Sequence, residues 1–72
     1  MKTKHSIYHY RQLHQISQVD LAAKLGIDAV TLWRYENFKS CPRGRVRDAI
    51  AKLLNKTPGA LVDEFISARR SA

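Results

Sequence analysis

The chain has 72 residues, of which 44% are hydrophobic and 26% are charged. This composition is typical of a folded globular protein and argues against a disordered chain, and we expect a single domain over residues 1–72. No apolar stretch approaches the roughly 20 residues needed to cross a bilayer. The basic N-terminus is not followed by the apolar block of a signal peptide. We therefore expect a cytoplasmic protein with no membrane partner.

Thirteen lysines and arginines stand against six acidic residues, which gives a net charge of +7. An excess this large in so short a chain favours a polyanionic partner. Taken alone, the charge fits equally well a positive surface that serves only solubility. Membrane-surface binding needs a basic helix with a wide apolar face, whereas the basic residues here are spread over several segments.

The first predicted helix covers about residues 6–14, with Ile7, Tyr10 and Leu13 facing inward. Arg11 lies among these apolar positions, where its charge needs either a partner or access to solvent or phosphate. His5 and His9 are spaced i, i+4, so on a helix that included both they would share one face as candidate metal ligands. No third and fourth ligand accompanies the two histidines, so we expect no metal site.

Residues 17–37 predict two short helices joined by a tight turn. Ser17 is a good N-cap, and Asp20 is placed to complete a capping box with it. Gly26 is suited to the left-handed conformation that ends the first of these helices, and Asp28 to capping the second. Two capped helices around a glycine turn are typical of a helix-turn-helix motif.

The periodicity of this motif separates a buried side from an outward side. In its first helix the expected apolar stripe is Val19, Leu21, Ala22 and Leu25. In its second helix an advance of about 100° per residue places Leu32 and Tyr35 on the buried side. The outward side then carries Ala29, Val30, Trp33, Arg34 and Asn37. A short helix of this kind suits insertion into the major groove of DNA.

In these residues the chain resembles the Cro and phage-repressor (lambda-repressor-like) helix-turn-helix family. The matching positions in the motif are Ser17-Gln18, Asp20-Leu21-Ala22, Leu25-Gly26-Ile27, Leu32 and Arg34-Tyr35-Glu36-Asn37. With Arg11, Pro42, Ile50-Ala51 and Leu53-Leu54, the resemblance covers roughly residues 7 to 66. It implies an all-α fold, a compact lambda-repressor-like bundle of five helices that binds double-stranded DNA.

The resemblance also implies an ion pair between Arg11 and Glu36, which would fix the position of the second motif helix. Two residues depart from the family pattern. Gln15 stands where the family usually has glycine, so either Gln15 adopts a strained left-handed angle or the first helix ends differently. Phe38 replaces the glycine that commonly follows Glu-Asn, and we expect its ring to fill a satellite cluster beneath the next loop.

After the motif, the residues of segment 38–44 predict a loop, with Pro42 near the start of the next helix. That helix runs to about residue 54 and can end at Asn55. Its apolar residues recur at helical spacing: Val46, Ala49, Ile50, Leu53 and Leu54.

Thr57 and Pro58 predict the start of a fifth helix. Its apolar residues are Leu61, Val62, Phe65 and Ile66. We expect the basic tail, about residues 68–72, to fray at Arg69-Arg70-Ser71-Ala72.

The outward face predicts two kinds of DNA contact. Arg34 is the candidate for reading a base, because its guanidinium matches O6 and N7 of guanine. Ala29 and Val30 are limited to thymine methyl groups or close approach, and Trp33 packs on a sugar or a thymine methyl unless it contacts protein instead. Phosphate contacts, which position the protein without reading sequence, are expected from Gln18, Asn37, Lys39, Arg43 and Arg45.

We therefore expect a sequence-specific transcriptional regulator, in the form of a Cro-like repressor that binds its operator as a homodimer and is either dimeric or monomeric when free. We expect no cofactor and no catalytic activity, because no phosphate-binding glycine loop or catalytic constellation is evident. Cys41 is the single cysteine, so no intrachain disulfide forms. Two alternatives stay open: an antitoxin- or adaptor-like protein-interaction module, and nonspecific packaging of DNA. Salt-dependent retention on DNA would distinguish a DNA-binding regulator from a protein-interaction module. Binding without a preferred site would instead indicate nonspecific packaging.

Overall fold

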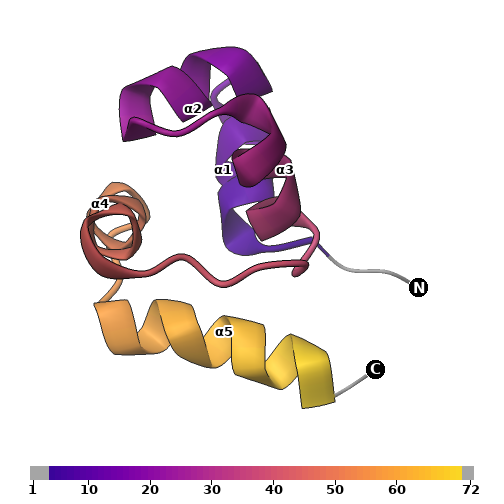
Figure 1. The fold of residues 1–72 in the computed structure, drawn as a ribbon, viewed down its shortest axis with the longest axis vertical. Helices are drawn as coiled ribbons and strands as arrows, with labels where there is room; N and C mark the ends of the chain where they lie inside the picture. The colour runs from indigo at the N-terminus through magenta and orange to yellow at the C-terminus, as the bar shows by residue number, and fades with distance from the viewer. Residues whose placement is uncertain (1–3, 71–72) are drawn as a thin grey trace.

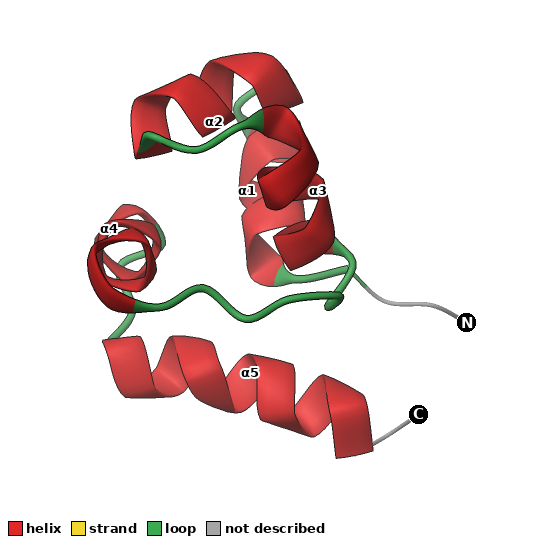
Figure 2. Ribbon diagram, viewed as in Figure 1, coloured by secondary structure: helices red, strands yellow, loops and turns green. Residues whose placement is uncertain are grey.

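The computed structural model describes residues 4–70, and its five helices are the only regular elements in that range (Figures 1 and 2). In chain order they are α1 (Ser6–Leu13), α2 (Gln18–Leu25), α3 (Ala29–Glu36), α4 (Gly44–Leu53) and α5 (Pro58–Arg70). The predicted all-α fold of five helices is confirmed. Between residues 4 and 70 no helix combines the length and the apolar composition that crossing a membrane requires.

The helices surround one core while leaving one side of α3 uncovered. α3 packs against α1 and α2, α4 contacts α2, and α5 packs on α4. Figure 1 shows α5 passing beneath α4 and the α1–α3 pair. Every helix contributes to the buried core, which consists of Ile7, Leu21, Ala22, Leu32, Ile50, Ala51, Leu61 and Phe65. Since α3 is held from behind, its other side is free to meet a partner.

The caps predicted for the helix-turn-helix are present. The Asp20 N–H donates to Ser17 Oγ at 3.0 Å, and the Thr31 N–H donates to Asp28 Oδ1 at 2.7 Å. Gly26 ends α2 with a φ of 75°, the left-handed conformation expected there. Only half of the predicted capping box forms among the described contacts, because the Asp20 carboxylate does not return a bond to Ser17. These local hydrogen bonds define where α2 and α3 begin.

Two residues expected to face inward are exposed, and the prediction was wrong for both. Leu13 is 79% exposed, because six residues of helix carry it about 120° around the axis from the buried Ile7. Val19 is 67% exposed, because it lies about 160° from Leu21 on the wheel. In both helices the residue was assigned to the buried face because it is apolar, although its angle on the helical wheel places it on another face.

Three residues other than glycine have a left-handed backbone. They are Gln15, Phe38 and Asn55, with φ of 54°, 59° and 58°. Gln15 therefore adopts the strained angle after α1, and Asn55 follows the C-cap of α4 as predicted. The Phe38 ring packs against the main core, 5.6 Å from the ring centre of Phe65, and so does not form a separate satellite cluster.

The ends of the last two helices differ from expectation in small ways. Pro42 is buried two residues before α4, and Arg43 is the N-cap of that helix without a side-chain capping bond. The Ala60 N–H donates to Thr57 Oγ1 at 3.1 Å, as expected for an N-cap. α5 remains helical through Arg70, so the prediction of fraying was wrong for Arg69-Arg70, and Ser71-Ala72 lie outside the described residues.

Candidate nucleic-acid interface

The uncovered side of α3 combines apolar and basic side chains. Val30 and Trp33 are 59% and 46% exposed, Arg34 is exposed, and Ala29 is half-buried. Ala29, Val30 and Trp33 line a shallow hollow together with Gln18, which begins α2. Thus the four residues predicted to read bases do occupy one face, and one of the predicted phosphate ligands lies beside them.

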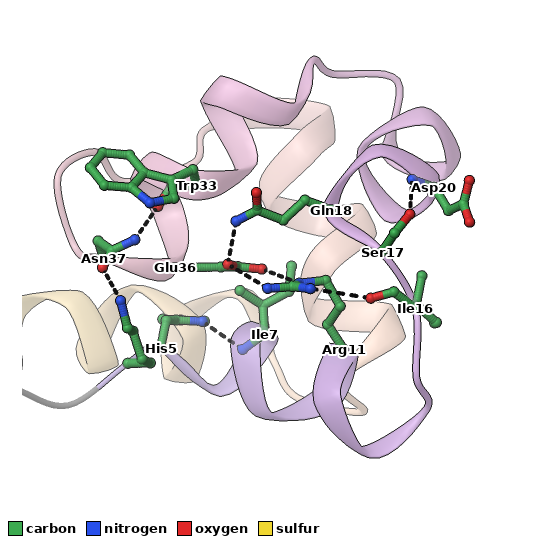
Figure 3. Close-up of polar contacts among 11 residues, drawn as sticks. His5, Ile7, Arg11, Ile16, Ser17, Gln18, Asp20, Trp33, Glu36 and Asn37 are labelled. Carbon is green, nitrogen blue, oxygen red and sulfur yellow. Dashed lines mark hydrogen bonds and ion pairs between the residues drawn. The ribbon is translucent and has the colours of Figure 1, made fainter.

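Behind this face, Glu36 is the centre of a polar cluster that joins three helices. Its carboxylate accepts hydrogen bonds from Arg11 Nε at 2.7 Å and from Arg11 Nη2 at 3.2 Å. Gln18 Nε2 donates to the same carboxylate at 3.0 Å, and Arg11 also donates to the Ile16 carbonyl at 3.2 Å. Figure 3 shows Glu36 lying between Arg11 and Gln18. The residues suggested as an ion pair are thus in bidentate contact, and Gln18 is part of the cluster.

Because this cluster is buried, its hydrogen-bond geometry determines how α3 is held against α1 and α2. The Glu36 side chain is 1% exposed, whereas the Arg11 side chain keeps some contact with solvent at 12%. A buried carboxylate is tolerated only when charged and neutral donors satisfy its oxygens, which Arg11 and Gln18 do here. Since these donors come from α1 and α2, they fix the C-terminal end of α3 relative to both helices.

Gln18 and Asn37 were both predicted to contact phosphate, and both make contacts within the protein. Gln18 uses one amide hydrogen on Glu36, which leaves its second amide hydrogen for another acceptor. Asn37, the C-cap of α3, donates from Nδ2 to the Trp33 carbonyl at 2.9 Å. Its Oδ1 accepts a hydrogen bond from the Lys4 ammonium. The Asn37 amide is therefore mainly a clamp on the end of α3.

His5 is a structural residue of the site that the sequence analysis missed. It is fully buried as the N-cap of α1, where its Nδ1 accepts from the Ile7 N–H at 3.0 Å. Its backbone N–H donates to the Glu36 carbonyl at 3.0 Å, and its ring stacks on Phe65 at 4.4 Å. The i, i+4 spacing with His9 had suggested a shared helix face, which was wrong because α1 begins only after His5. Among residues 4–70 no group of metal-ligating side chains is assembled.

Burial lowers the pKa of His5 to about 4, although the nearby Glu64 carboxylate opposes this shift. His5 Nε2 lies 3.4 Å from Glu64 Oε1 and has no closer partner. Glu64 is held by the Ser6 N–H at 2.7 Å and by Lys56 Nζ at 3.1 Å. Burial by itself raises the pKa of Glu64, but the hydrogen bonds from Ser6 and Lys56 outweigh it and lower that pKa. The neutral His5 and ionised Glu64 thus join α5 to the start of α1.

A helix-turn-helix family model of the Cro/C1 type matches residues 7–61, more than half of the chain. The chain belongs to the Cro/C1-type helix-turn-helix family. The matched range includes the whole motif and stops five residues short of the extent that the resemblance suggested. No curated protein sequence and no solved structure matches the chain significantly. The family is one of DNA-binding regulators, and no catalytic activity follows from membership.

In this Cro/C1-type domain α3 is the second helix of the motif, and basic residues follow it in the sequence. Lys39, Arg43 and Arg45 are all exposed, and none of them forms an ion pair with a residue of the described range. Arg43 and Arg45 flank the first residue of α4. The positive charge of this segment is therefore available to an external anion.

Proposed function

We propose that the protein is a sequence-specific transcriptional repressor that binds double-stranded operator DNA by inserting α3 into the major groove. The observation that carries this proposal is the exposure of Val30, Trp33 and Arg34 on a helix whose opposite side is fixed by the buried Glu36 cluster. A rigidly held helix of this size fits the major groove, which is about 12 Å wide. Binding to a promoter in this way would exclude RNA polymerase and so repress transcription. A protein with this function acts in the cytoplasm, where it meets the DNA.

The side chains of this face divide between base reading and backbone contact. Arg34 reads guanine through O6 and N7, a contact worth about 1 to 3 kcal/mol of discrimination. The hollow of Ala29, Val30 and Trp33 accepts a thymine methyl group, because its walls are mostly carbon. The phosphate contacts come from Lys39, Arg43 and Arg45, and from the second amide hydrogens of Gln18 and Asn37, whose first amide hydrogens are used within the protein.

The proposed DNA complex contains two copies of the chain. In helix-turn-helix dimers, recognition helices about 34 Å apart read successive turns of the same DNA face. The preferred sequence should therefore be a palindrome whose half-sites lie about 10 base pairs apart. If the free protein is a monomer and two copies bind one operator, the binding curve should depend on the square of the protein concentration.

The experiment that tests this function is selection of bound duplexes from a random pool, followed by titration of the selected site and its single base-pair variants. Arg34→Ala should relax the preference at one G·C pair per half-site by roughly 5- to 150-fold. Lys39→Ala should weaken all sequences alike and reduce the dependence of log K on log salt by about 0.9 per subunit, or about 1.8 for the complex of two copies. Wild-type discrimination retained by Arg34→Ala would contradict the role of Arg34.

The exposed Trp33 beside an apolar hollow also favours a second candidate, a protein-interaction module that uses the same face. The same experiment separates the two functions. A repressor gives a selected sequence and steep salt dependence, whereas a protein-binding module need not be retained on DNA or heparin. Equal binding to every duplex in the pool would instead indicate nonspecific packaging.

A further inference from the structure

Lys4 is a basic residue that the structure fixes at the end of α3, although it lies before α1 in the sequence. Its ammonium donates to Asn37 Oδ1, at the C-cap of α3, and lies 5.7 Å from the ring centre of Tyr8 on α1. Asn37 in turn donates to the Trp33 carbonyl at 2.9 Å. Thus a chain of two hydrogen bonds links the Lys4 ammonium to Trp33, one of the residues that line the exposed hollow.

The charge of Lys4 is not neutralised within the described part of the chain. The ion pairs of residues 4–70 join Arg11 to Glu36, Arg47 to Asp48 and Lys56 to Glu64, with His5 also near Glu64. The partners of Lys4, by contrast, are a neutral amide and an aromatic ring. An ammonium has three donor hydrogens, and Asn37 takes one of them. Lys4 therefore keeps a full positive charge and free donors at a defined place.

That place is suited to a DNA phosphate. α3 has eight residues and is about 12 Å long, which is close to the width of the major groove. A cation fixed at one end of a helix that lies in the groove is consequently within reach of the sugar-phosphate backbone beside it. We propose that Lys4 contacts a phosphate of the bound DNA and that Asn37 serves to position Lys4 for this contact. This inference rests on the proposed binding of DNA by α3.

A purely structural role makes a different prediction. A lysine near the C-terminus of a helix also stabilises it by interacting with the last carbonyls and the helix dipole. Replacing such a residue changes stability but not the number of counterions released when DNA binds. The salt dependence of binding therefore distinguishes a phosphate ligand from a helix cap.

The test compares Lys4→Gln and Lys4→Arg with Lys52→Gln on the selected duplex over a range of salt concentrations. Lys52 is a matched control because it is exposed, lacks an ion pair among the described residues, and lines a different hollow between α2 and α4. Lys4→Gln should lower the slope of log K against log salt by about 0.9 per subunit, or about 1.8 for the complex of two copies, without changing which base pairs are preferred. Lys4→Arg and Lys52→Gln should keep the wild-type slope.

The outcomes separate this inference from the proposed function. A wild-type slope in Lys4→Gln, or an equal reduction in Lys52→Gln, would overturn the phosphate contact while leaving DNA binding intact. A wild-type protein that shows no salt-dependent binding to any duplex would overturn the proposed function itself. Thermal unfolding of each variant establishes that it is folded at the temperature of the titration.

Discussion

At the scale of single residues, the orientation of α3 depends most on Glu36. Its carboxylate is buried and accepts hydrogen bonds from both Arg11 and Gln18. Removing one partner of such a pair leaves an uncompensated charge, whereas removing both leaves an apolar site that is often tolerated. The pair therefore has a clear signature when a single and a double variant are compared with wild type.

Arg11→Met should lower the free energy of unfolding by about 3 to 5 kcal/mol, because the Glu36 carboxylate then loses its charged partner. The double variant Arg11→Met/Glu36→Met should be more stable than Arg11→Met alone, since no buried charge remains. Urea unfolding of the three proteins measures both differences. An Arg11→Met protein within 1 kcal/mol of wild type would show that the pair does not matter for stability.

The buried neutral His5 predicts that stability depends on pH. Its pKa is about 4 in the folded protein and near 6.5 when unfolded, so the unfolded chain binds the extra proton between these values. Stability is then fully present above pH 6.5 and is lost as the pH falls toward 4. Between pH 7.5 and pH 5 the loss should be about 2 kcal/mol. The ionisable groups that act on this ring are Glu64, Lys56, Glu36 and His9.

His5→Asn provides the measurement, because asparagine retains the N-cap but does not titrate. The variant should lose most of the change in melting temperature between pH 7.5 and pH 5, while His9→Asn should retain it. The lowered pKa of Glu64 acts in the same direction but mainly below its ordinary value of 4.5. An unchanged pH profile in His5→Asn would rule out His5 as its source.

At the scale of the elements, the turns after α1 and α3 share one backbone conformation but differ in their surroundings. Gln15 and Phe38 have φ of 54° and 59°, where a side chain costs about 1 to 2 kcal/mol. Gln15 is exposed, whereas Phe38 packs its ring against His5 and Phe65. The same substitution should therefore have opposite effects at the two positions.

Gln15→Gly should stabilise the protein by about 0.5 to 1 kcal/mol, because relief of strain exceeds the added entropy of the unfolded chain. Phe38→Gly should destabilise it by about 1 to 3 kcal/mol, because lost packing outweighs the same relief. Denaturant midpoints of the two variants measure these changes. A destabilising Gln15→Gly would mean that the Gln15 side chain makes a contact that offsets its strain.

The features that could be predicted from sequence are those decided within a few residues. The caps at Ser17, Asp28 and Thr57 and the glycine turn depend on local hydrogen bonds, and the structure has them as expected. The exposed Leu13 and Val19 were misassigned because an eight-residue helix has little more than two turns in which to define a stripe. The angle of each residue on the helical wheel, measured from Ile7 or Leu21, would have assigned both residues correctly to the exposed side.

The parts that could not be predicted depend on contacts between distant segments. His5 is buried because Phe65 and Glu64 of α5 contact it, and Lys4 is held by Asn37, the C-cap of α3. Neither contact leaves a pattern in the sequence around residues 4 and 5. At the candidate site, the outward residues of α3 followed from periodicity, whereas the involvement of Gln18 and Asn37 in internal hydrogen bonds did not.

At the scale of the whole molecule, the five helices work as a support for one exposed helix. α1 and α2 fix α3 through Glu36, and α5 fixes the start of α1 through Glu64 and His5. Three of the six acidic residues pair with a cation in the described range, whereas Lys39, Arg43 and Arg45 have no such partner there. An excess of unpaired cations near a rigid helix favours fast, salt-dependent association with DNA.

The most direct test of this account is a titration of the isotopically labelled protein with the selected duplex, followed by the backbone amide resonances. We expect the largest shifts at residues 29–37 of α3 and in the following basic segment, with the amides of the hollow between α2 and α4 little changed. Resonances of residues 29–37 that stay unmoved while that second surface responds would contradict the claim that α3 reads the major groove.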